Sequence, residues 1–303
     1  MIARFQHLER EQQGMALGLA AVLLWSTVAT AFKLALNVWP LIGVLWLSST
    51  VSLVLFSGVL WHLGLLGRAI RWLRRYWRRA ILMGLLNPVV YYFTLFAAYD
   101  QLSAQIAQPI NYTWAFVLSL MAAIWLKAPI RARDWQGMAL GYLGVLVLVL
   151  GAQGRLEVTL PGVFLAILST FFWALYWVVG MRDKRPPLVA MFHHFLIAWP
   201  VLTVIMLWQG TDFFRESAGW LPTLYIGLFE MGLAFLFWMT ALQRVKNTAR
   251  VANLIFIAPF LSLIWVSLIL HEPILASSPI GLGFILLGQW WQRRKEKLPS
   301  PTS

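Results

Sequence analysis

The chain has 303 residues, of which 60% are hydrophobic and only 12% are charged, and its formal net charge is +13. A soluble domain carries about 25% charged residues, so this composition argues against an ordinary soluble enzyme and indicates a membrane protein. Cysteine is absent, which excludes disulfide frameworks, thiolate nucleophiles and cysteine-based metal centres.

Ten apolar runs predict transmembrane helices, because a bilayer core of about 30 Å needs roughly 20 residues at about 1.5 Å rise each. In chain order they cover residues 14–36, 40–63, 80–99, 103–126, 135–150, 161–179, 187–208, 221–242, 249–270 and 278–291. The segment before the first run contains Glu9 and Glu11 and lacks a small-residue cleavage site, so we expect no removed signal peptide. The predicted fold class is therefore all-α, with ten membrane-spanning helices.

The basic residues follow the predicted loops. All but three of the 24 Lys and Arg residues fall at the termini or in alternate loops, the exceptions being Lys33, Arg155 and Arg215. Short cytoplasmic loops retain positive charge, so we expect a multi-pass protein of a bacterial inner membrane with both termini in the cytoplasm. The largest basic cluster consists of Arg68, Arg71, Arg74, Arg75, Arg78 and Arg79, interleaved with Trp72, Tyr76 and Trp77. It favours contact with anionic membrane lipid over nucleic acid, so no nucleic-acid partner is expected.

The two halves of the chain resemble each other. Leu126, Pro129, Ile130, Ala132, Gly137, Leu143 and Gly144 recur 144 positions later as Leu270, Pro273, Ile274, Ala276, Gly281, Leu287 and Gly288. Each half holds five predicted spans, and an odd number reverses the orientation of the second half. We therefore predict two inverted five-helix repeats, residues 1–152 and 153–303, an architecture typical of secondary transporters. Similarity of apolar composition alone is the alternative.

Several motifs carry a family resemblance that covers nearly the whole chain. They are Leu24-Trp25-Ser26-Thr27, Ala97-Ala98-Tyr99, Ser103-Ala104-Gln105-Ile106-Ala107 and His271-Glu272-Pro273-Ile274. With them the chain resembles EamA-like proteins of the drug/metabolite transporter superfamily, which implies a ten-helix transporter. Lys127-Ala128-Pro129 departs from the family, since many members carry Glu where Ala128 stands.

A further tetrapeptide bears on the solute. Asn111-Tyr112-Thr113-Trp114 is similar to a stretch of the aromatic amino-acid exporter branch, although Ala115 follows where that branch usually has Pro. The resemblance thus implies export of amino acids, the aromatic ones among them.

Glu230 lies in the middle of the eighth run, with no basic residue within a helical turn. A charged side chain at the bilayer centre is unfavourable by roughly 2.5 to 3.5 kcal/mol, so we expect Glu230 to have a specific functional or structural role. Our hypothesis is that Glu230 couples proton movement to transport or binds an amine of the solute. The alternative is a protonated carboxyl that joins two helices by a hydrogen bond.

Polar and aromatic residues inside the runs are candidates for solute binding. Gln108, Asn111 and Tyr112 lie beside Pro109, and a proline there frees a backbone carbonyl for a zwitterionic solute. Asn253 occupies the matching place in the second half. The aromatic candidates are Trp25, Trp114 and Trp173. Hydrogen bonding between helices and simple packing are the alternatives for all of these residues.

Three further features have a structural interpretation. Asn87-Pro88 predicts a helix kink, because proline removes a backbone hydrogen bond. His193 and His194 are adjacent, so their rings are expected on different faces, without a shared metal, and a proton relay through one of them is the alternative. Lys33 is expected to extend toward the outer membrane surface, the alternative being a gate contact with Glu272 or Asp100.

The sequence therefore predicts a secondary transporter that exports amino acids or related metabolites by alternating access. No Walker A, dinucleotide or Gly-x-Ser-x-Gly motif occurs, so we expect no enzyme activity, no cofactor and no metal. The expected partners are a small-molecule solute and lipid, with the protein a monomer or weak homodimer. The alternatives are an importer or exchanger of another solute, an intramembrane enzyme, and a receptor or scaffold without flux.

Overall fold

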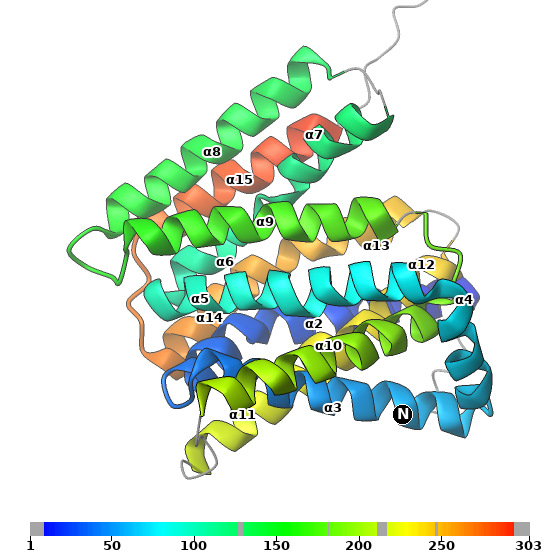
Figure 1. Cartoon of the computed structure of the whole chain (residues 1–303). Helices are drawn as coiled ribbons and strands as arrows, with labels where there is room; N and C mark the ends of the chain where they lie inside the picture. Colours follow the sequence, from blue (N-terminus) through cyan, green and yellow to red (C-terminus); the bar gives the residue numbers. More distant parts are fainter. Residues whose placement is uncertain (1–8, 127–129, 181, 211–216, 246–247, 294–303) are drawn as a thin grey trace, which may run out of the picture.

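The computed structural model describes residues 9–126, 130–180, 182–210, 217–245 and 248–293, and these are almost entirely helical (Figure 1). Arg215 and the Lys127-Ala128-Pro129 motif lie outside the described residues. The first half contains α2 (Arg10–Leu36), α3 (Leu41–His62), α4 (Leu66–Gly84), η1 (Leu85–Val90), α5 (Tyr91–Gln101), α6 (Ala104–Tyr112), α7 (Trp114–Leu126) and α8 (Ala132–Ala152).

The second half follows a similar order, with several helices divided into shorter segments. It contains α9 (Leu160–Gly180), α10 (Pro187–Gln209), η2 (Ser217–Gly219), α11 (Trp220–Tyr225), η3 (Ile226–Ala234), α12 (Phe235–Arg244), α13 (Thr248–Leu254), η4 (Ile255–Ile257), α14 (Ala258–Leu270) and α15 (Ser277–Arg293). Segments η1 and η3 are π-helical, whereas η2 and η4 are 3-10 helices.

Each of the ten predicted runs coincides with one helix or with consecutive helical segments. Within the described parts of the chain, seven helical stretches are long and apolar enough to cross a membrane: Arg10–Leu36, Leu41–His62, Leu66–Gln101, Ala132–Ala152, Leu160–Gly180, Pro187–Gln209 and Ser217–Arg244. The other three runs are shorter as helices, because the fourth is divided at Thr113, the ninth contains η4, and α15 has 17 residues. The prediction of an all-α polytopic membrane protein is confirmed.

Two helix breaks lie near a proline. The kink predicted at Asn87-Pro88 is present, since Asn87 has the non-helical angles φ −146° and ψ 117°. A proline cannot donate its backbone nitrogen, so Pro88 leaves a carbonyl of the preceding turn without its helical partner. Pro109 lies inside α6, which ends three residues later at Tyr112, and the Thr113 hydroxyl donates to the Ile110 carbonyl at 2.7 Å just after it.

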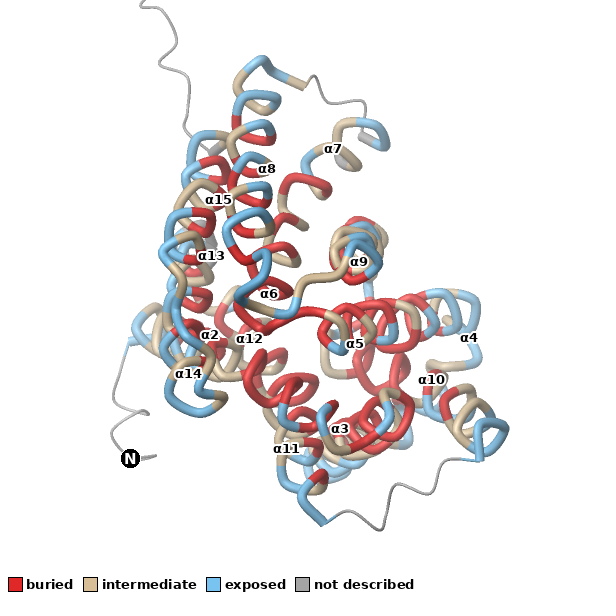
Figure 2. The backbone as a smooth tube through the Cα atoms, turned by 90° about the vertical axis from the view of Figure 1, so that its left-hand side faces the viewer, coloured by how far each residue is buried: buried red, intermediate tan, exposed pale blue. Residues whose placement is uncertain are grey.

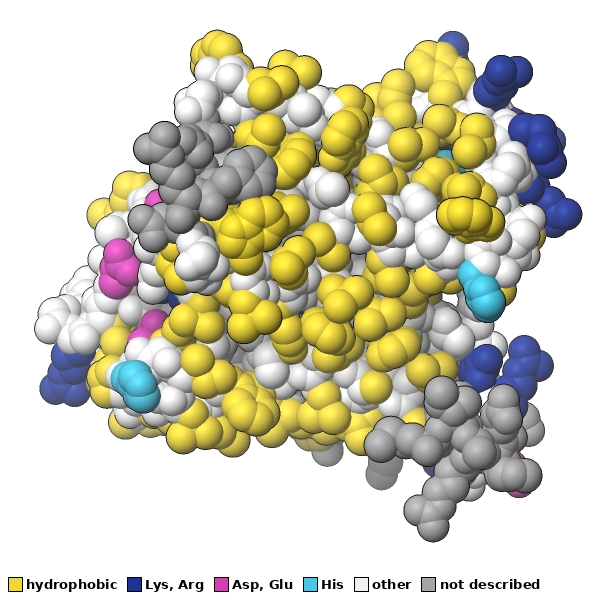
Figure 3. All heavy atoms as spheres, turned by 90° about the horizontal axis from the view of Figure 1, so that it is seen from below, with side chains coloured by type: hydrophobic (Ala, Val, Ile, Leu, Met, Phe, Trp, Pro, Cys, Tyr) yellow, Lys and Arg dark blue, Asp and Glu magenta, His cyan; other side chains and the backbone are white. Residues whose placement is uncertain are grey.

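The helices run side by side, as the view along their axes in Figure 2 shows, with buried positions facing inward. Lys and Arg side chains gather at one end of the bundle, at the right of Figure 3. We call this the arginine-rich end; α4 and the link between α9 and α10 lie there (Figure 1). The other end, where α2 ends and α9 begins, is called the opposite end.

Helices α8 and α15 contact each other through paired glycines. A methyl group added to Gly137 would lie 2.6 Å from the carbonyl oxygen of Gly288, and one added to Gly281 would lie 2.6 Å from that of Gly144. Such distances leave no room for a side chain, so the two backbones touch directly. Close approach of this kind is typical of small residues in membrane helices.

Candidate solute-binding cavity

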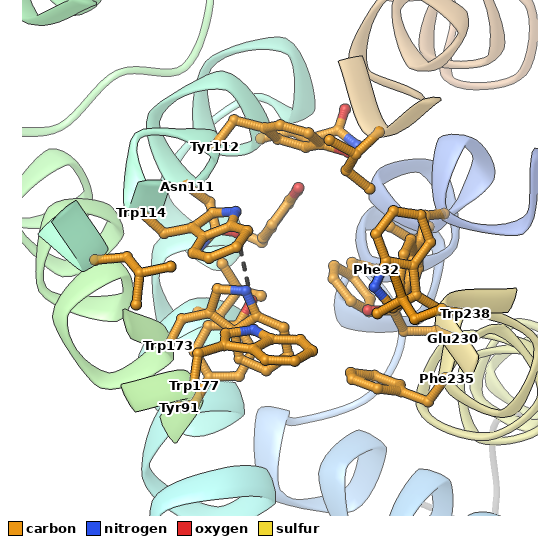
Figure 4. A pocket seen from close by; sticks show the side chains of 18 residues that line it. Phe32, Tyr91, Asn111, Tyr112, Trp114, Trp173, Trp177, Glu230, Phe235 and Trp238 are labelled. Atoms are coloured by element: carbon orange, nitrogen blue, oxygen red, sulfur yellow. Dashed lines mark hydrogen bonds between the residues drawn. The ribbon is translucent and has the colours of Figure 1, made fainter. Parts of the chain in front are cut away.

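A cavity of about 250 Å³ lies between the helices (Figure 4). Its volume is near the lower end of the roughly 300 to 1,000 Å³ typical of small-molecule sites. Eight helical segments contribute the lining residues, which are Trp25, Val28, Phe32, Tyr91, Leu95, Tyr99, Gln108, Asn111, Tyr112, Trp114, Leu118, Trp173, Trp177, Glu230, Phe235, Trp238, Leu242 and Ile255. The cavity therefore joins both halves of the chain.

Aromatic rings form two facing walls of the cavity (Figure 4). On one side Tyr91 stacks on Trp173, with ring centroids 4.4 Å apart, and Trp114 stacks on Trp177 at 6.3 Å. On the other side Trp25 lies 5.2 Å from Trp238 and 5.7 Å from Phe235. Flat rings of this kind suit the faces of an aromatic or cationic solute.

Glu230 supplies a carboxyl group to the second wall. It is buried in the π-helical segment η3, where an extra residue in the turn alters the direction of the side chain. The Tyr92 hydroxyl donates to Oε1 at 3.1 Å, while Oε2 has no hydrogen-bond partner among the described residues. Among the described residues, the lining contains no Lys or Arg, so a solute amine would find a carboxyl without a competing cation.

Asn111 supplies an amide to the wall opposite Glu230 (Figure 4). Its Oδ1 accepts a hydrogen bond from the Tyr91 hydroxyl at 3.3 Å, and its Nδ2 donates to Ser169 Oγ at 2.9 Å. These two hydrogen bonds, to α5 and α9, hold the amide in place near the end of α6. Gln108, one turn earlier, lines the same cavity.

The structure brings most of the residues singled out from the sequence to this cavity. They are Trp25, Gln108, Asn111, Tyr112, Trp114, Trp173 and Glu230. Asn253 does not line the cavity and is exposed. Val251, on the buried face of α13, packs against Gly18. Asn253 follows two residues later, about 200° around the helix, so its side chain points away from that buried face.

Sequence reasoning missed other members of the lining, notably Phe32, Tyr99, Trp177 and Phe235. Helical spacing would have found two of them, because Trp177 lies one turn after Trp173 and Phe32 lies two turns after Trp25. The same spacing relates Tyr99 to Tyr91, two turns earlier, and Phe235 to Trp238, one turn later.

The cavity is covered at the opposite end by charged contacts. Lys33 is 8% exposed, and its Nζ donates to the Tyr99 carbonyl at 3.0 Å and pairs with Glu157 at 3.2 Å. The expectation that Lys33 extends to the membrane surface is therefore wrong, since Glu157 from the α8–α9 link reaches it instead. The Lys33–Glu157 pair thus joins α2 to the α8–α9 link.

A second polar contact at the same end involves Glu272. Its carboxylate accepts from the backbone nitrogen of Ala104 and from Gln105 Nε2, both at 3.2 Å. Leu102 and Val158 form an antiparallel bridge beside it. Toward the arginine-rich end, by contrast, the lining continues to Trp177 and Leu242, in the last turns of α9 and α12.

Comparison with known proteins gives relatives over most of the chain. An uncharacterised transporter of Archaeoglobus fulgidus is 22% identical over 280 residues, covering 90% of this chain and 96% of its own length. The aromatic amino acid exporter YddG of Ancylobacter novellus is 24% identical, covering 81% and 85%. A probable amino-acid metabolite efflux pump of Salmonella typhimurium is 23% identical, covering 61% and 66%.

A solved crystal structure has the same fold, with a TM-score of 0.69 and 22% identity over 93% of this chain and 96% of that one. The model of the EamA-like transporter family matches twice, at residues 12–150 and 160–291. The chain therefore belongs to the EamA-like transporter family of the drug/metabolite transporter superfamily.

Proposed function

We propose that the protein is a secondary active transporter that exports amino acids, aromatic ones included, or related small metabolites. The observation that carries this proposal is a cavity with the Glu230 carboxyl on one wall and the Asn111 amide on the other. An amino acid has an ammonium group for Glu230 and a carboxylate for the amide groups of Asn111 and Gln108. Its side chain would lie between the aromatic walls.

The relatives support the same solute class. One bears the name of an aromatic amino acid exporter and another that of an amino-acid metabolite efflux pump. Each is less than 25% identical to this chain, so the solute itself has to be measured.

We infer that alternating access rests on two inverted repeats, residues 1–152 and 153–303. The α8–α15 glycines support this inference. Gly137 and Gly144 correspond to Gly281 and Gly288 at the offset of 144, and the contacts pair Gly137 with Gly288 and Gly144 with Gly281. A two-fold axis between the halves requires this exchange of partners. The family model, which matches each half once, supports it as well.

The orientation in the membrane is part of the proposal. We place the arginine-rich end in the cytoplasm of a bacterium, following the positive-inside rule, so that both termini are cytoplasmic. The contacts of Lys33 and Glu272 then close the outer side of the cavity, while the lining extends toward the cytoplasm. An exporter would load its solute from this state.

The test is transport of radiolabelled tryptophan, phenylalanine, alanine and glutamate in proteoliposomes, with and without a pH gradient. We expect flux of the aromatic pair that responds to the gradient. Glu230→Gln should weaken solute binding roughly 10- to 100-fold, since a charge-assisted hydrogen bond is lost, and should abolish the response to pH. Glu11→Gln, which lies outside the cavity, is the control. Flux of none of these amino acids would refute the solute class, and an unchanged pH profile would refute the role of Glu230.

A further inference from the structure

The first part of α4, residues 66–75, forms an arm at the arginine-rich end. Figure 1 shows it crossing the ends of neighbouring helices instead of running parallel to them. Tyr76, with φ −114° and ψ 18°, separates this arm from the rest of the helix. The arm therefore lies where the headgroups of a surrounding bilayer would be.

One face of the arm is basic. Arg68, Arg71 and Arg75 are exposed and follow the spacing i, i+3, i+7, which places them on one side of a helix, and Arg74 is exposed next to them. Helix α4 contains no acidic residue, and no ion pair within the described part of the chain involves these arginines. This face is therefore free to bind phosphate, whose oxygens match the planar donor fork of arginine.

The arm also exposes apolar surface. Ile70 is 52% exposed and Trp77, just beyond the arm, is 50% exposed, whereas Ala69 on the inner side is buried. A helix with a basic face and exposed apolar side chains is typical of an element that lies in the membrane interface.

A buried network ties the arm to α10. His193 Nε2 lies 2.8 Å from the carbonyl oxygen of Ala69, and His193 Nδ1 lies 3.0 Å from Nη1 of Arg185. A guanidinium can only donate, so Nδ1 accepts, and the protonated Nε2 donates a hydrogen bond to the Ala69 carbonyl. Arg185 in turn is held by Asp183, at 2.6 Å. The prediction that the two histidines point apart misses this shared arginine, which also lies 3.1 Å from His194.

We propose that the arm docks onto anionic phospholipid, whose phosphate groups occupy the face made by Arg68, Arg71, Arg74 and Arg75. The exposed apolar side chains insert among the acyl chains beside it. His193 holds the lipid-bound arm against α10, so that anionic lipid orders the arginine-rich end of the protein. This goes beyond the presence of a basic loop, because the surface, its occupant and its internal contact are all specified.

The first test is native mass spectrometry of the protein with equal amounts of phosphatidylglycerol and phosphatidylcholine. The wild type should retain phosphatidylglycerol severalfold more, and the variant Arg71→Gln/Arg75→Gln should lose most of that preference. Arg131→Gln/Arg133→Gln, which removes the same charge outside α4, should keep it. Equal retention of both lipids by the wild type would overturn the proposal, as would equal losses in the two variants.

The second test is hydrogen exchange in nanodiscs of the same two lipids. Phosphatidylglycerol should slow exchange severalfold in residues 66–75 and in the first turns of α10. His193→Ala should retain lipid binding but lose the protection in α10, and His193→Gln, which keeps a donor for Ala69, should restore part of it. Protection of α10 that persists in His193→Ala would refute the coupling of the arm to α10 through His193. The arginine variants test lipid docking even if His193→Ala fails to fold.

Discussion

Charged contacts hold both ends of the bundle, and those at the opposite end cover the cavity. At the opposite end, Lys33 pairs with Glu157 across 124 positions of sequence, and Gln105 contacts Glu272 across 167. At the arginine-rich end, Arg185 pairs with Asp183 within one short segment, and Arg250 pairs with Glu11 across 239 positions. The contacts at the opposite end must break before the cavity can open there. We infer that the opposite end is the one that opens.

Burial distinguishes the Lys33–Glu157 pair from the Asp183–Arg185 pair. The side chains of Lys33 and Glu157 are 10% and 53% exposed, whereas those of Arg185 and Asp183 are 0% and 10% exposed. Half-exposed ion pairs contribute little to stability, and breaking a buried pair is strongly destabilising because it leaves an unpaired charge. Stability and opening should therefore respond to different substitutions.

The largest effect is expected from Asp183→Asn. The change leaves the buried Arg185 without its carboxylate, which should destabilise the protein by about 3 to 5 kcal/mol. Thermal unfolding in detergent would measure it. Glu11→Gln, which removes the half-exposed partner of Arg250, should change stability by about 0 to 1 kcal/mol. Equal shifts in both variants would remove the contrast between the buried pair and the exposed pair.

Acidification offers a check on the same pair. Burial alone raises the pKa of Asp183, but hydrogen bonds and the positive charge of Arg185 outweigh burial and lower it. The ionised carboxylate thus contributes stability above the unfolded pKa of about 3.9, and that stability is lost as the pH falls through the lowered folded pKa. The melting temperature of Asp183→Asn should fall less in that acidic range than that of the wild type.

An intermediate effect is expected in the α8–α15 contact, which runs between both ends. Gly281→Ala places a methyl group 2.6 Å from the Gly144 carbonyl, so overpacking should destabilise by about 1 to 3 kcal/mol. Gly283→Ala in the same helix meets nothing within 4 Å and should be neutral or stabilising by up to about 1 kcal/mol. Unfolding curves of the two variants, measured together, test this. A silent Gly281→Ala would show that the backbones do not touch.

The smallest change in stability, and the clearest change in access, is expected from Lys33→Met. Loss of the Glu157 pair should shift the conformational equilibrium by at most about 1 kcal/mol, or roughly fivefold. Because the chain has no cysteine, Leu95→Cys in the cavity lining introduces a single thiol. A membrane-impermeant thiol reagent applied from the opposite end should label it faster in Lys33→Met.

Arg155→Gln is the control for that experiment, since it removes an exposed positive charge at the same end. Labelling that is equally fast in all three backgrounds would mean that the Lys33–Glu157 contact does not restrict access. The Lys33–Glu157 contact would then not be what closes the opposite end.

Apolar runs were sufficient to predict where most spans lie. The run 161–179 matches α9, and 187–208 matches α10, to within one residue, because bilayer thickness and helical rise fix the length. The arm of α4 was not predicted as a helix, because its arginines make the segment too polar to be recognised as a membrane span. The division between α6 and α7 at Thr113 was likewise not anticipated, because Pro109 lies a full turn earlier.

The candidate cavity was predictable where a single residue conflicts with its surroundings. Glu230 stood out as a lone charge in an apolar run, and Asn111 as an amide beside a proline. Contacts that depend on tertiary structure were not accessible, as the Lys33–Glu157 pair shows. Asn253 does not line the cavity, because correspondence between repeats fixes a position along the helix but not the side it faces.

The density of indole rings around the cavity has a spectroscopic consequence. Five of the 18 tryptophans line it, namely Trp25, Trp114, Trp173, Trp177 and Trp238. A solute that absorbs at the emission wavelength of tryptophan would quench these five by energy transfer and leave the distant rings brighter. Fluorescence of the unlabelled protein can therefore report occupancy by an absorbing solute of this kind before any flux is measured.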